Sequence, residues 1–248
     1  MELIKTVVYA VLIAIVVRTV AYEPFNIPSP SMVPTLLVGD YLFVSKFAYG
    51  YSRYSLPFGL PLFSGRILFH SPHQGDVVVF KLPSDTSKDF IKRLIGLPGD
   101  RVQVTAGELY VNGKEVPRVK VKDEQCPDNL AIVCTLYTET LPDGVQHPIL
   151  KRAGYEQTGP NNTPVYTVPP NHYFMMGDNR DNSDDSRGVV GYVPAENLVG
   201  PAEFLFYSFC SADSPIPNDP TCNGYAHWWE VWKWPFAIRY DRLFRGVH

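Results

Sequence analysis

Two serines stand among prolines in the segment Pro28-Ser29-Pro30-Ser31, and a serine hydroxyl is a candidate nucleophile. Proline restricts its own φ and the conformation of the residue before it, so this segment is a stiff loop. Such a loop can present a hydroxyl beside backbone N–H groups, which acyl transfer uses as nucleophile and oxyanion hole. The same composition also suits a rigid linker without chemistry, and the segment alone does not separate the two.

Lys92 lies in an otherwise apolar stretch that ends in the turn sequence Gly-Leu-Pro-Gly-Asp at residues 96–100. A lysine of ordinary pKa, about 10.4, is charged at neutral pH and cannot act as a base. Burial disfavours the charged form, and lowering the pKa to about 7 takes roughly 4–5 kcal/mol. Lys92 is therefore a candidate general base if it is buried, and an ordinary lysine if it lies on an exposed strand.

A third segment, residues 177–187, combines turn-forming residues with charges of both signs. Carboxylates at alternate positions are typical of calcium loops, but the glycine and final glutamate of an EF-hand are missing and two arginines interrupt the pattern. The pattern favours a hydrogen-bonded loop with Asp–Arg pairs.

The elements around these segments are predicted to be short strands. The runs 76–81, 101–105 and 172–176 are rich in β-branched or aromatic residues, and the chain has 23 prolines and 18 glycines. Residues 108–116 predict a hairpin, since Asn112-Gly113 suits a type I′ turn. Residues from about 117 to 170 show weak periodicity and are interpreted as part of an inserted subdomain.

Leu3 to Ala21 is the one stretch whose composition suits a bilayer. As a helix it spans about 28 Å, against about 30 Å for the hydrocarbon core. Lys5 and Arg18 lie near its ends, where long side chains reach the headgroups. A cleaved signal peptide, with Lys5 before the apolar run and Thr19-Val20-Ala21 as cleavage site, fits equally well.

Four cysteines form two local pairs, Cys126 with Cys134 and Cys210 with Cys222. Both pairs lie in loop-like sequence and suit surface disulfides in an oxidising compartment, although three connectivities are open and free thiols are the alternative. No Cys-x-x-Cys occurs and the six histidines are scattered, so no metal site is expected. The net charge of −3 gives no reason to expect nucleic acid.

Taken together, the three segments resemble one family. S-x-S-M-x-P-T-L (29–36), K-R-x-x-G-L-P-G-D (92–100) and G-D-N-R-D-N-S-x-D-S-R (177–187) follow an apolar helix in that order. The chain is similar here to the bacterial type I signal peptidases (leader peptidases), and most similar to their Gram-negative members. The resemblance covers the N-terminal helix, residues 22–49, 74–102 and 173–201, and the last few residues.

The resemblance implies a role for each matched residue. Ser31 would be the nucleophile and Lys92 the general base of a Ser/Lys dyad. Ser183 would orient the lysine amine, and the Ser29 hydroxyl would complete the oxyanion hole with the Ser31 N–H. Structural support would come from two ion pairs, Arg93 with Asp178 and Asp185 with Arg187. The apolar pockets for small substrate side chains would be lined by Phe25, Ile27, Pro28, Met32, Leu36, Phe90 and Ile91.

The family also implies the architecture, the location and the activity. We expect a mainly β protein: an N-terminal transmembrane helix (1–21), an antiparallel β catalytic domain (22–102 and 171–248) and an inserted second β subdomain (103–170). The N-terminus would be cytoplasmic and the catalytic domain periplasmic, with a single pass through the inner membrane. The enzyme would remove signal peptides from exported preproteins, after small residues at the first and third positions before the bond, without cofactor, metal or obligatory protein partner.

Several alternatives remain open at this point. The enzyme could serve one dedicated substrate, or the chain could be a non-catalytic tethered module. A Ser–His–Asp protease is less attractive because none of the three motifs contains a histidine. Four tryptophans between 228 and 234 suit either a membrane interface or ordinary core packing.

Overall fold

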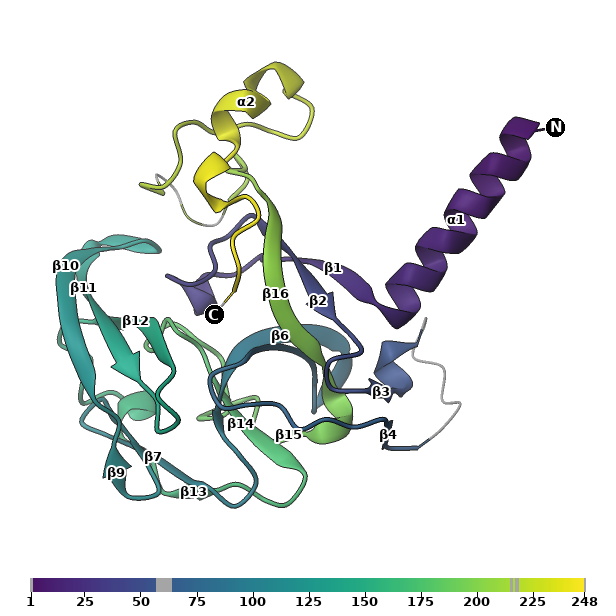
Figure 1. Ribbon diagram of the computed structural model, residues 1–248. Coiled ribbons are helices and arrows are strands. Elements are labelled where there is room, and N and C mark those ends of the chain that lie inside the picture. The colour runs from purple at the N-terminus through teal and green to yellow at the C-terminus, as the bar shows by residue number, and fades with distance from the viewer. Residues whose placement is uncertain (1, 57–63, 215, 217–218, 248) are drawn as a thin grey trace.

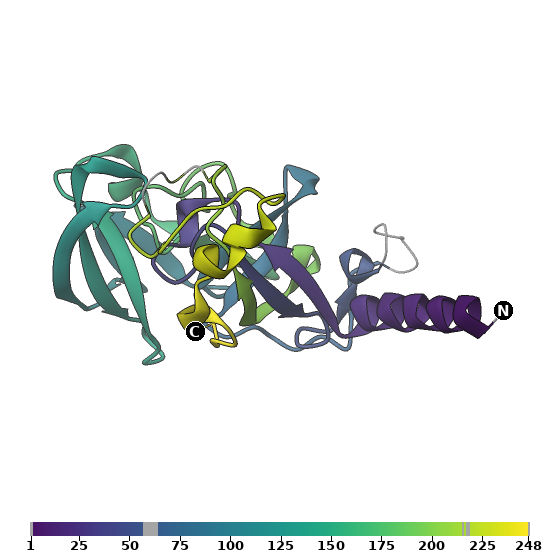
Figure 2. The same ribbon diagram turned by 90° about the horizontal axis from the view of Figure 1, so that it is seen from above.

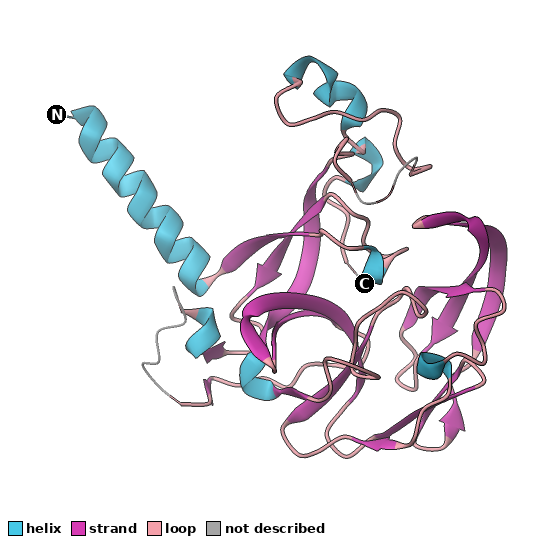
Figure 3. Ribbon diagram, turned by 180° about the vertical axis from the view of Figure 1, so that it is seen from behind, coloured by secondary structure: helices cyan, strands magenta, loops and turns pink. Residues whose placement is uncertain are grey.

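Antiparallel strands make up most of the regular structure in the computed structural model, which describes residues 2–56, 64–214, 216 and 219–247 (Figure 3). The expectation of a mainly β protein is confirmed. Helical structure among these residues is limited to α1 (Glu2–Val20), α2 (Trp234–Ala237) and short 3-10 turns.

A seven-stranded sheet positions all three motifs. In spatial order it runs β1 (Tyr22–Asn26), β2 (Asp40–Ser45), β16 (Leu198–Ser208), β5 (Val77–Leu82), β6 (Asp85–Gly96), β14 (His172–Met176) and β15 (Val193–Pro194), and every neighbouring pair is antiparallel. The serine loop follows β1, Lys92 lies in β6, and the third motif follows β14. The strand expected over 76–81 is found one residue later, as β5, and that over 172–176 is β14.

Smaller sheets form most of the region between β6 and β14. One contains β13 (Tyr166–Thr167), β7 (Arg101–Thr105), β8 (Glu108–Val111) and β9 (Lys114–Glu115); another contains β10 (Arg118–Cys126), β11 (Asn129–Thr140) and β12 (Gln146–Arg152). A two-stranded sheet outside this region, between β2 and β5 in the chain, pairs β3 (Tyr51–Ser52) with β4 (Arg66–Ile67). The predicted hairpin is confirmed as β8–β9, with positive φ at Asn112 and Gly113. The weak periodicity of residues 117–170 conceals long strands (Figure 1). Whether residues 103–170 form a subdomain of their own stays a prediction.

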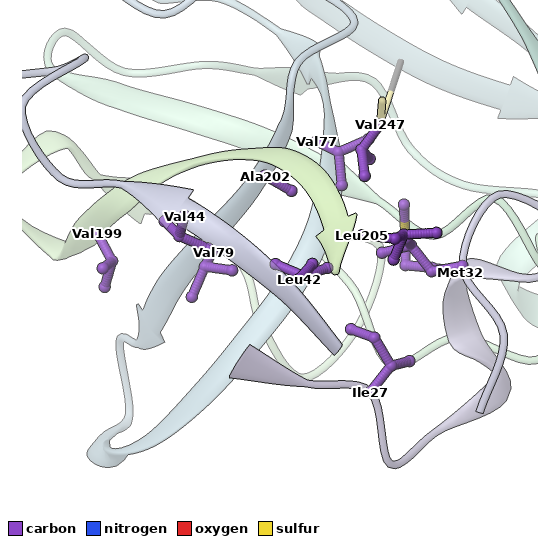
Figure 4. Close-up of a cluster of buried hydrophobic side chains, with 11 residues drawn as sticks. Ile27, Met32, Leu42, Val44, Val77, Val79, Val199, Ala202, Leu205 and Val247 are labelled. Atoms are coloured by element: carbon purple, nitrogen blue, oxygen red, sulfur yellow. The ribbon is translucent and has the colours of Figure 1, made fainter. Parts of the chain in front are cut away.

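A hydrophobic cluster lies next to the serine loop. It joins Ile27 and Met32 to side chains of β2, β5 and β16, among them Leu42 and Leu205 (Figure 4). Burying an aliphatic side chain of this size stabilises a protein by about 1.5–3 kcal/mol. The loop after β1 is therefore held against the sheet by its own buried apolar side chains.

Helix α1 projects from the β-sheets (Figures 1 and 2). Among the described residues, no helix combines the length and the apolar character required to cross a membrane. The side chains of Leu3, Ile4 and Val7 are exposed.

The predicted cysteine pairs are confirmed as disulfides, Cys126–Cys134 and Cys210–Cys222. Their expected position at the surface is wrong for the first pair. Cys126 and Cys134 are fully buried, packed with Val33 and Leu37. The reason is that Cys126 ends β10 and Cys134 lies within β11, so the disulfide joins two paired strands beneath the serine loop and not an exposed loop.

Candidate active site

Ser31 lies in a short 3-10 turn, Pro30–Met32, and the local sequence favours this turn. A proline at the start of a helical turn has the required φ and no N–H to leave unpaired. The Val33 N–H donates to the Pro30 carbonyl at 3.1 Å and closes the turn. Met32 and Val33 are buried, and Ser31 itself is 7% exposed. The turn therefore presents the Ser31 hydroxyl from a fixed backbone.

Lys92 reaches Ser31 from the sheet. Its Nζ lies 2.6 Å from Ser31 Oγ and donates to the Ile91 carbonyl at 2.9 Å. In β6 the residues before Phe90 are mostly exposed, whereas Lys92 and the four residues after it are buried. Pairing with β5 on one side and β14 on the other gives this buried half of the strand its position.

The environment of Lys92 favours the neutral amine. Burial lowers the pKa of Lys92 to about 8, although the negative charges of Asp185, Asp184 and Asp178 act in the opposite direction. At pH 7 about a tenth of such amines are neutral, which is about 300-fold more than for an ordinary lysine. The group can therefore accept a proton near physiological pH.

Two further serines were predicted around this pair. Ser29 Oγ lies 3.3 Å from Ser31 Oγ, so the two hydroxyls adjoin. Ser183 Oγ is buried and makes no hydrogen bond within the described structure, so its predicted contact with Lys92 is not formed here. The lysine amine is instead hydrogen-bonded to Ser31 and to the Ile91 carbonyl.

Arg93 follows Lys92 in β6 and pairs with Asp178, and both side chains are at most 1% exposed. Arg93 donates to the two Asp178 oxygens at 2.8 and 2.7 Å, a bidentate arrangement. Burial opposes ionisation of Asp178, but the charge and hydrogen bonds of Arg93 outweigh it and keep the pKa of this carboxyl below its usual range. Thr35 donates to the same carboxylate at 2.5 Å, which connects the serine motif to the third motif.

The third motif contacts the serine loop through its backbone and side chains. The Asn179 N–H donates to the Ser31 carbonyl and the Asn179 amide to the Pro30 carbonyl, both at 3.1 Å. Asp185 accepts from the Gly177 N–H and pairs with Arg187 at 2.7 Å, so this predicted ion pair is present. Burial disfavours charge on Asp185, but Arg187 overrides it and the pKa of Asp185 is lowered.

A buried ionic group from the three-stranded sheet also adjoins the site, and none of the sequence motifs predicted it. Glu139 pairs with Arg180, and burial of Glu139 is outweighed by Arg180, which lowers the pKa of Glu139 to about 2. The ring nitrogens of His147 lie 3.3 Å from Glu139 and 3.4 Å from Asp178. Because both nitrogens are directed at carboxylates, His147 is not arranged to accept a proton from a serine, which argues against a Ser–His–Asp site. His147 was not predicted to lie near the site because it is outside all three motifs.

The residues expected to line the substrate pockets differ in exposure. Phe25, Phe90 and Ile91 are partly exposed and Pro28 is exposed. Met32 and Leu36 have no exposed surface and Ile27 only 3%, because all three lie in the hydrophobic cluster of Figure 4. In this conformation they form the base beneath a surface and not the surface itself.

Within residues 2–56, 64–214, 216 and 219–247, no group of three or more His, Cys, Asp or Glu side chains is arranged to hold a metal ion.

Comparison with known proteins gives consistent matches. The family model described as signal peptidase, peptidase S26, matches residues 1–207. A signal peptidase I of Rickettsia akari (strain Hartford) is 36% identical over 259 residues, covering 97% of this chain and 90% of the relative. Another, of Rickettsia typhi (strain ATCC VR-144 / Wilmington), is 43% identical over 206 residues, covering 81% of this chain and 77% of the relative.

A solved structure of a signal peptidase I from Enterococcus faecalis V583 is 26% identical and covers 53% of this chain and 97% of that chain, with a TM-score of 0.32. The family model extends over all three motifs, and the two relatives cover most of this chain. The chain therefore belongs to the signal peptidase family, peptidase S26.

Proposed function

We propose that this protein is a membrane-bound serine endopeptidase that removes N-terminal signal peptides from exported preproteins, with Ser31 as nucleophile and neutral Lys92 as general base. The observation that carries the proposal is the 2.6 Å approach of the Lys92 amine to the Ser31 hydroxyl. Burial lowers the pKa of the lysine to about 8, so a base is available beside the hydroxyl. Family membership supports the same conclusion.

The chemistry follows from this arrangement. The neutral amine takes the Ser31 proton while the oxygen attacks the carbonyl carbon before the cut bond. The resulting ammonium gives that proton to the leaving amine, and an acyl-enzyme remains. Water then attacks the ester, with Lys92 again as base. The Ser29 hydroxyl, 3.3 Å from Ser31 Oγ, and the Ser31 N–H stabilise the oxyanion.

Ser183 orients the base in this proposal. A neutral amine has two N–H donors and one lone pair. With the lone pair directed at the Ser31 hydroxyl and one N–H at the Ile91 carbonyl, one N–H is left. Ser183 Oγ, buried and without a hydrogen-bond partner among the described residues, is the acceptor that a small movement would supply.

The specificity for small residues rests on the limited space around the dyad. Phe25 and Ile91 leave partly exposed apolar surface over a base of buried side chains that includes Met32 and Leu36. Phe90, also partly exposed, packs against a neighbouring cluster. A shallow surface of this kind suits alanine-sized side chains at the first and third positions before the bond.

The location is part of the proposal. Two disulfides favour an oxidising compartment for the β-sheets. The N-terminal helix projects from them with exposed apolar side chains, which supports its use as a single-pass anchor with a cytoplasmic N-terminus and a periplasmic catalytic domain. Protease added to spheroplasts should digest the catalytic domain, and resistance without membrane lysis would contradict this topology.

The proposal is tested by cleavage of a purified preprotein in detergent. Wild type should cut after an Ala-x-Ala-type site, as sequencing of the new N-terminus would establish, whereas Ser31→Ala and Lys92→Met should be inactive. Lys151→Met is the matched control: burial lowers the pKa of Lys151 to about 8 as well, but its amine donates to Asn161 and not to a serine. Cleavage that survives in Lys92→Met would put the base elsewhere.

A panel of unrelated preproteins separates a general signal peptidase from a dedicated one. The general enzyme should cut most of the panel, and the dedicated enzyme only one member. Failure to cut any preprotein would contradict both and favour a binding role.

A further inference from the structure

A pocket of about 360 Å³ lies between residues 159–166 and residues 183–189. Ser183, which orients the base in the mechanism above, lies in its lining, but the pocket itself has no role in that mechanism. Its walls combine the apolar side chains of Pro160, Tyr166 and Val189 with the polar groups of Ser183, Asp184 and Arg187. A partly apolar hollow of this volume with a few polar groups is typical of a site for a small ligand or a peptide side chain.

One wall of the pocket adjoins the dyad. A Cβ placed on Gly177 would lie 2.2 Å from Ser183 Oγ and 2.5 Å from the Ser31 carbonyl oxygen, so only a glycine separates the pocket from the serine loop. The buried Ser183 hydroxyl has no hydrogen-bond partner in the described structure. The negative charges of Asp184 and Asp185 are also close enough to Lys92 to raise its pKa, because they stabilise the ammonium form.

The pocket lies away from the residues proposed for the acyl side of the bond. Phe25, Ile91 and the other five residues of that set are all absent from its lining. The leaving amine must pass beside Lys92, because the lysine ammonium protonates it. A substrate chain that continues past Lys92 on the side of Ser183 would meet this pocket, because Ser183 and Asp184 belong to its lining.

We propose that the pocket is the subsite for the first residue on the amine side of the cut bond, and that Asp184 gives this subsite a preference for basic over acidic residues. Asp185 is neutralised by Arg187. Asp184 is exposed and takes part in no ion pair within the described residues, so its charge remains available to a substrate. The proposal rests on the peptidase function proposed above.

The test uses the full chain in detergent and three peptides with one Ala-x-Ala site, differing only in Lys, Ala or Glu after the cut. For wild type, kcat/KM should be about 10-fold higher for the lysine peptide than for the glutamate peptide, from the opposite Coulomb energies. Asp184→Asn should bring the ratio within about 2-fold, and Asp184→Lys should invert it. Loss of the Asp184 charge also lowers the pKa of Lys92. That effect is common to all three peptides, so it cancels in the ratio of their kcat/KM values.

Two control variants separate charge from shape. Glu115→Gln removes an exposed carboxylate outside the pocket and should keep the wild-type ratio. Gly188 lines the pocket, and a Cβ there would have no neighbour within 4 Å. Gly188→Trp should therefore slow the lysine and glutamate peptides more than the alanine peptide.

The outcomes distinguish the two proposals. Cleavage of the alanine peptide with a lysine-to-glutamate ratio near one in wild type would overturn the subsite and leave the peptidase function standing. Retention of the lysine preference in Asp184→Lys would overturn it as well. If wild type cuts none of the three peptides, the peptidase function and the subsite both fail.

Discussion

The amine of Lys92 and the hydroxyl of Ser31 lie 2.6 Å apart although 61 positions separate them in the sequence. Lys92 is 3% exposed and Ser31 7%, so both groups are largely removed from water. Burial has two effects on this pair. It destabilises the ammonium, and it limits the competition of solvent for the serine hydroxyl.

Activity should rise with pH through the pKa of Lys92. Burial lowers that pKa to about 8, and the neutral amine, the active form, predominates above it. We expect kcat/KM to show an ascending limb near pH 8. Asp184→Asn should move this limb to lower pH, because the Asp184 charge stabilises the ammonium. A limb near pH 10 would indicate a lysine in water.

Lys92→Met should stabilise the protein in a pH-dependent way. The pKa of Lys92 is about 8 in the folded protein and 10.5 for an ordinary lysine, so the unfolded chain binds more protons between these pH values. The free energy of unfolding of the wild type therefore rises with pH across this window. The destabilisation caused by burying the charged Lys92 amine is largest below pH 8. The gain from Lys92→Met should exceed its value at pH 10.5 by about 3 kcal/mol at pH 7. Urea unfolding at both pH values measures it, and a constant gain would contradict the burial argument.

Gly177→Ala should inactivate the enzyme through the position of Ser31. The added Cβ would lie 2.5 Å from the Ser31 carbonyl oxygen and 2.2 Å from Ser183 Oγ, so the serine loop must shift. Misplacement of a catalytic group by about 1 Å costs about 100-fold in rate. Gly188→Ala, whose small Cβ meets nothing within 4 Å, is the control and should retain activity toward the alanine peptide, which needs the least space in the proposed subsite. Equal activity of both variants would show that the loop adapts.

Arg93 and Asp178 should depend on each other for stability. Asp178→Asn leaves the Arg93 charge buried without its bidentate partner, and breaking such a pair costs about 3–5 kcal/mol. Thermal or urea unfolding measures the loss. Lys120→Met breaks an exposed ion pair with Asp123 and should change stability little. Similar losses in both variants would rule out a special role for burial.

The tryptophan segment is predicted to enter the membrane interface. Trp228, Trp229 and Trp232 are 73%, 52% and 67% exposed, so ordinary core packing does not account for them. Aromatic side chains of this kind favour the headgroup region. All four tryptophans of the chain lie in 228–234, so their fluorescence reports on this segment alone.

In bilayers with brominated acyl chains, this fluorescence should be quenched in the full-length protein. Replacing Trp228 and Trp229 with serine should reduce the quenched fraction. Val119→Ser, at an exposed apolar position in β10, should not change it. Unquenched wild-type fluorescence would exclude contact with the lipid.

The sequence determined those features that depend on neighbouring residues. Asn112-Gly113 specified its hairpin because two positive φ angles are required there, and runs of β-branched or aromatic residues located β7 and β14. Each disulfide joins cysteines 8 or 12 positions apart, so local pairing was a sound expectation. The three motifs identified the family before any contact was known.

The tertiary structure decided what depends on distant segments. Lys92 is buried between β5 and β14, and this burial, which no local pattern reports, makes it a candidate base and not a surface lysine. His147 and Glu139 reached the site only through the three-stranded sheet, whose strands the weak periodicity concealed. Met32 is part of the hydrophobic core because the turn that contains Ser31 packs against β2, β5 and β16 of the seven-stranded sheet. Burial and electrostatic environment are sums over residues far apart in the chain, so only the folded arrangement sets them.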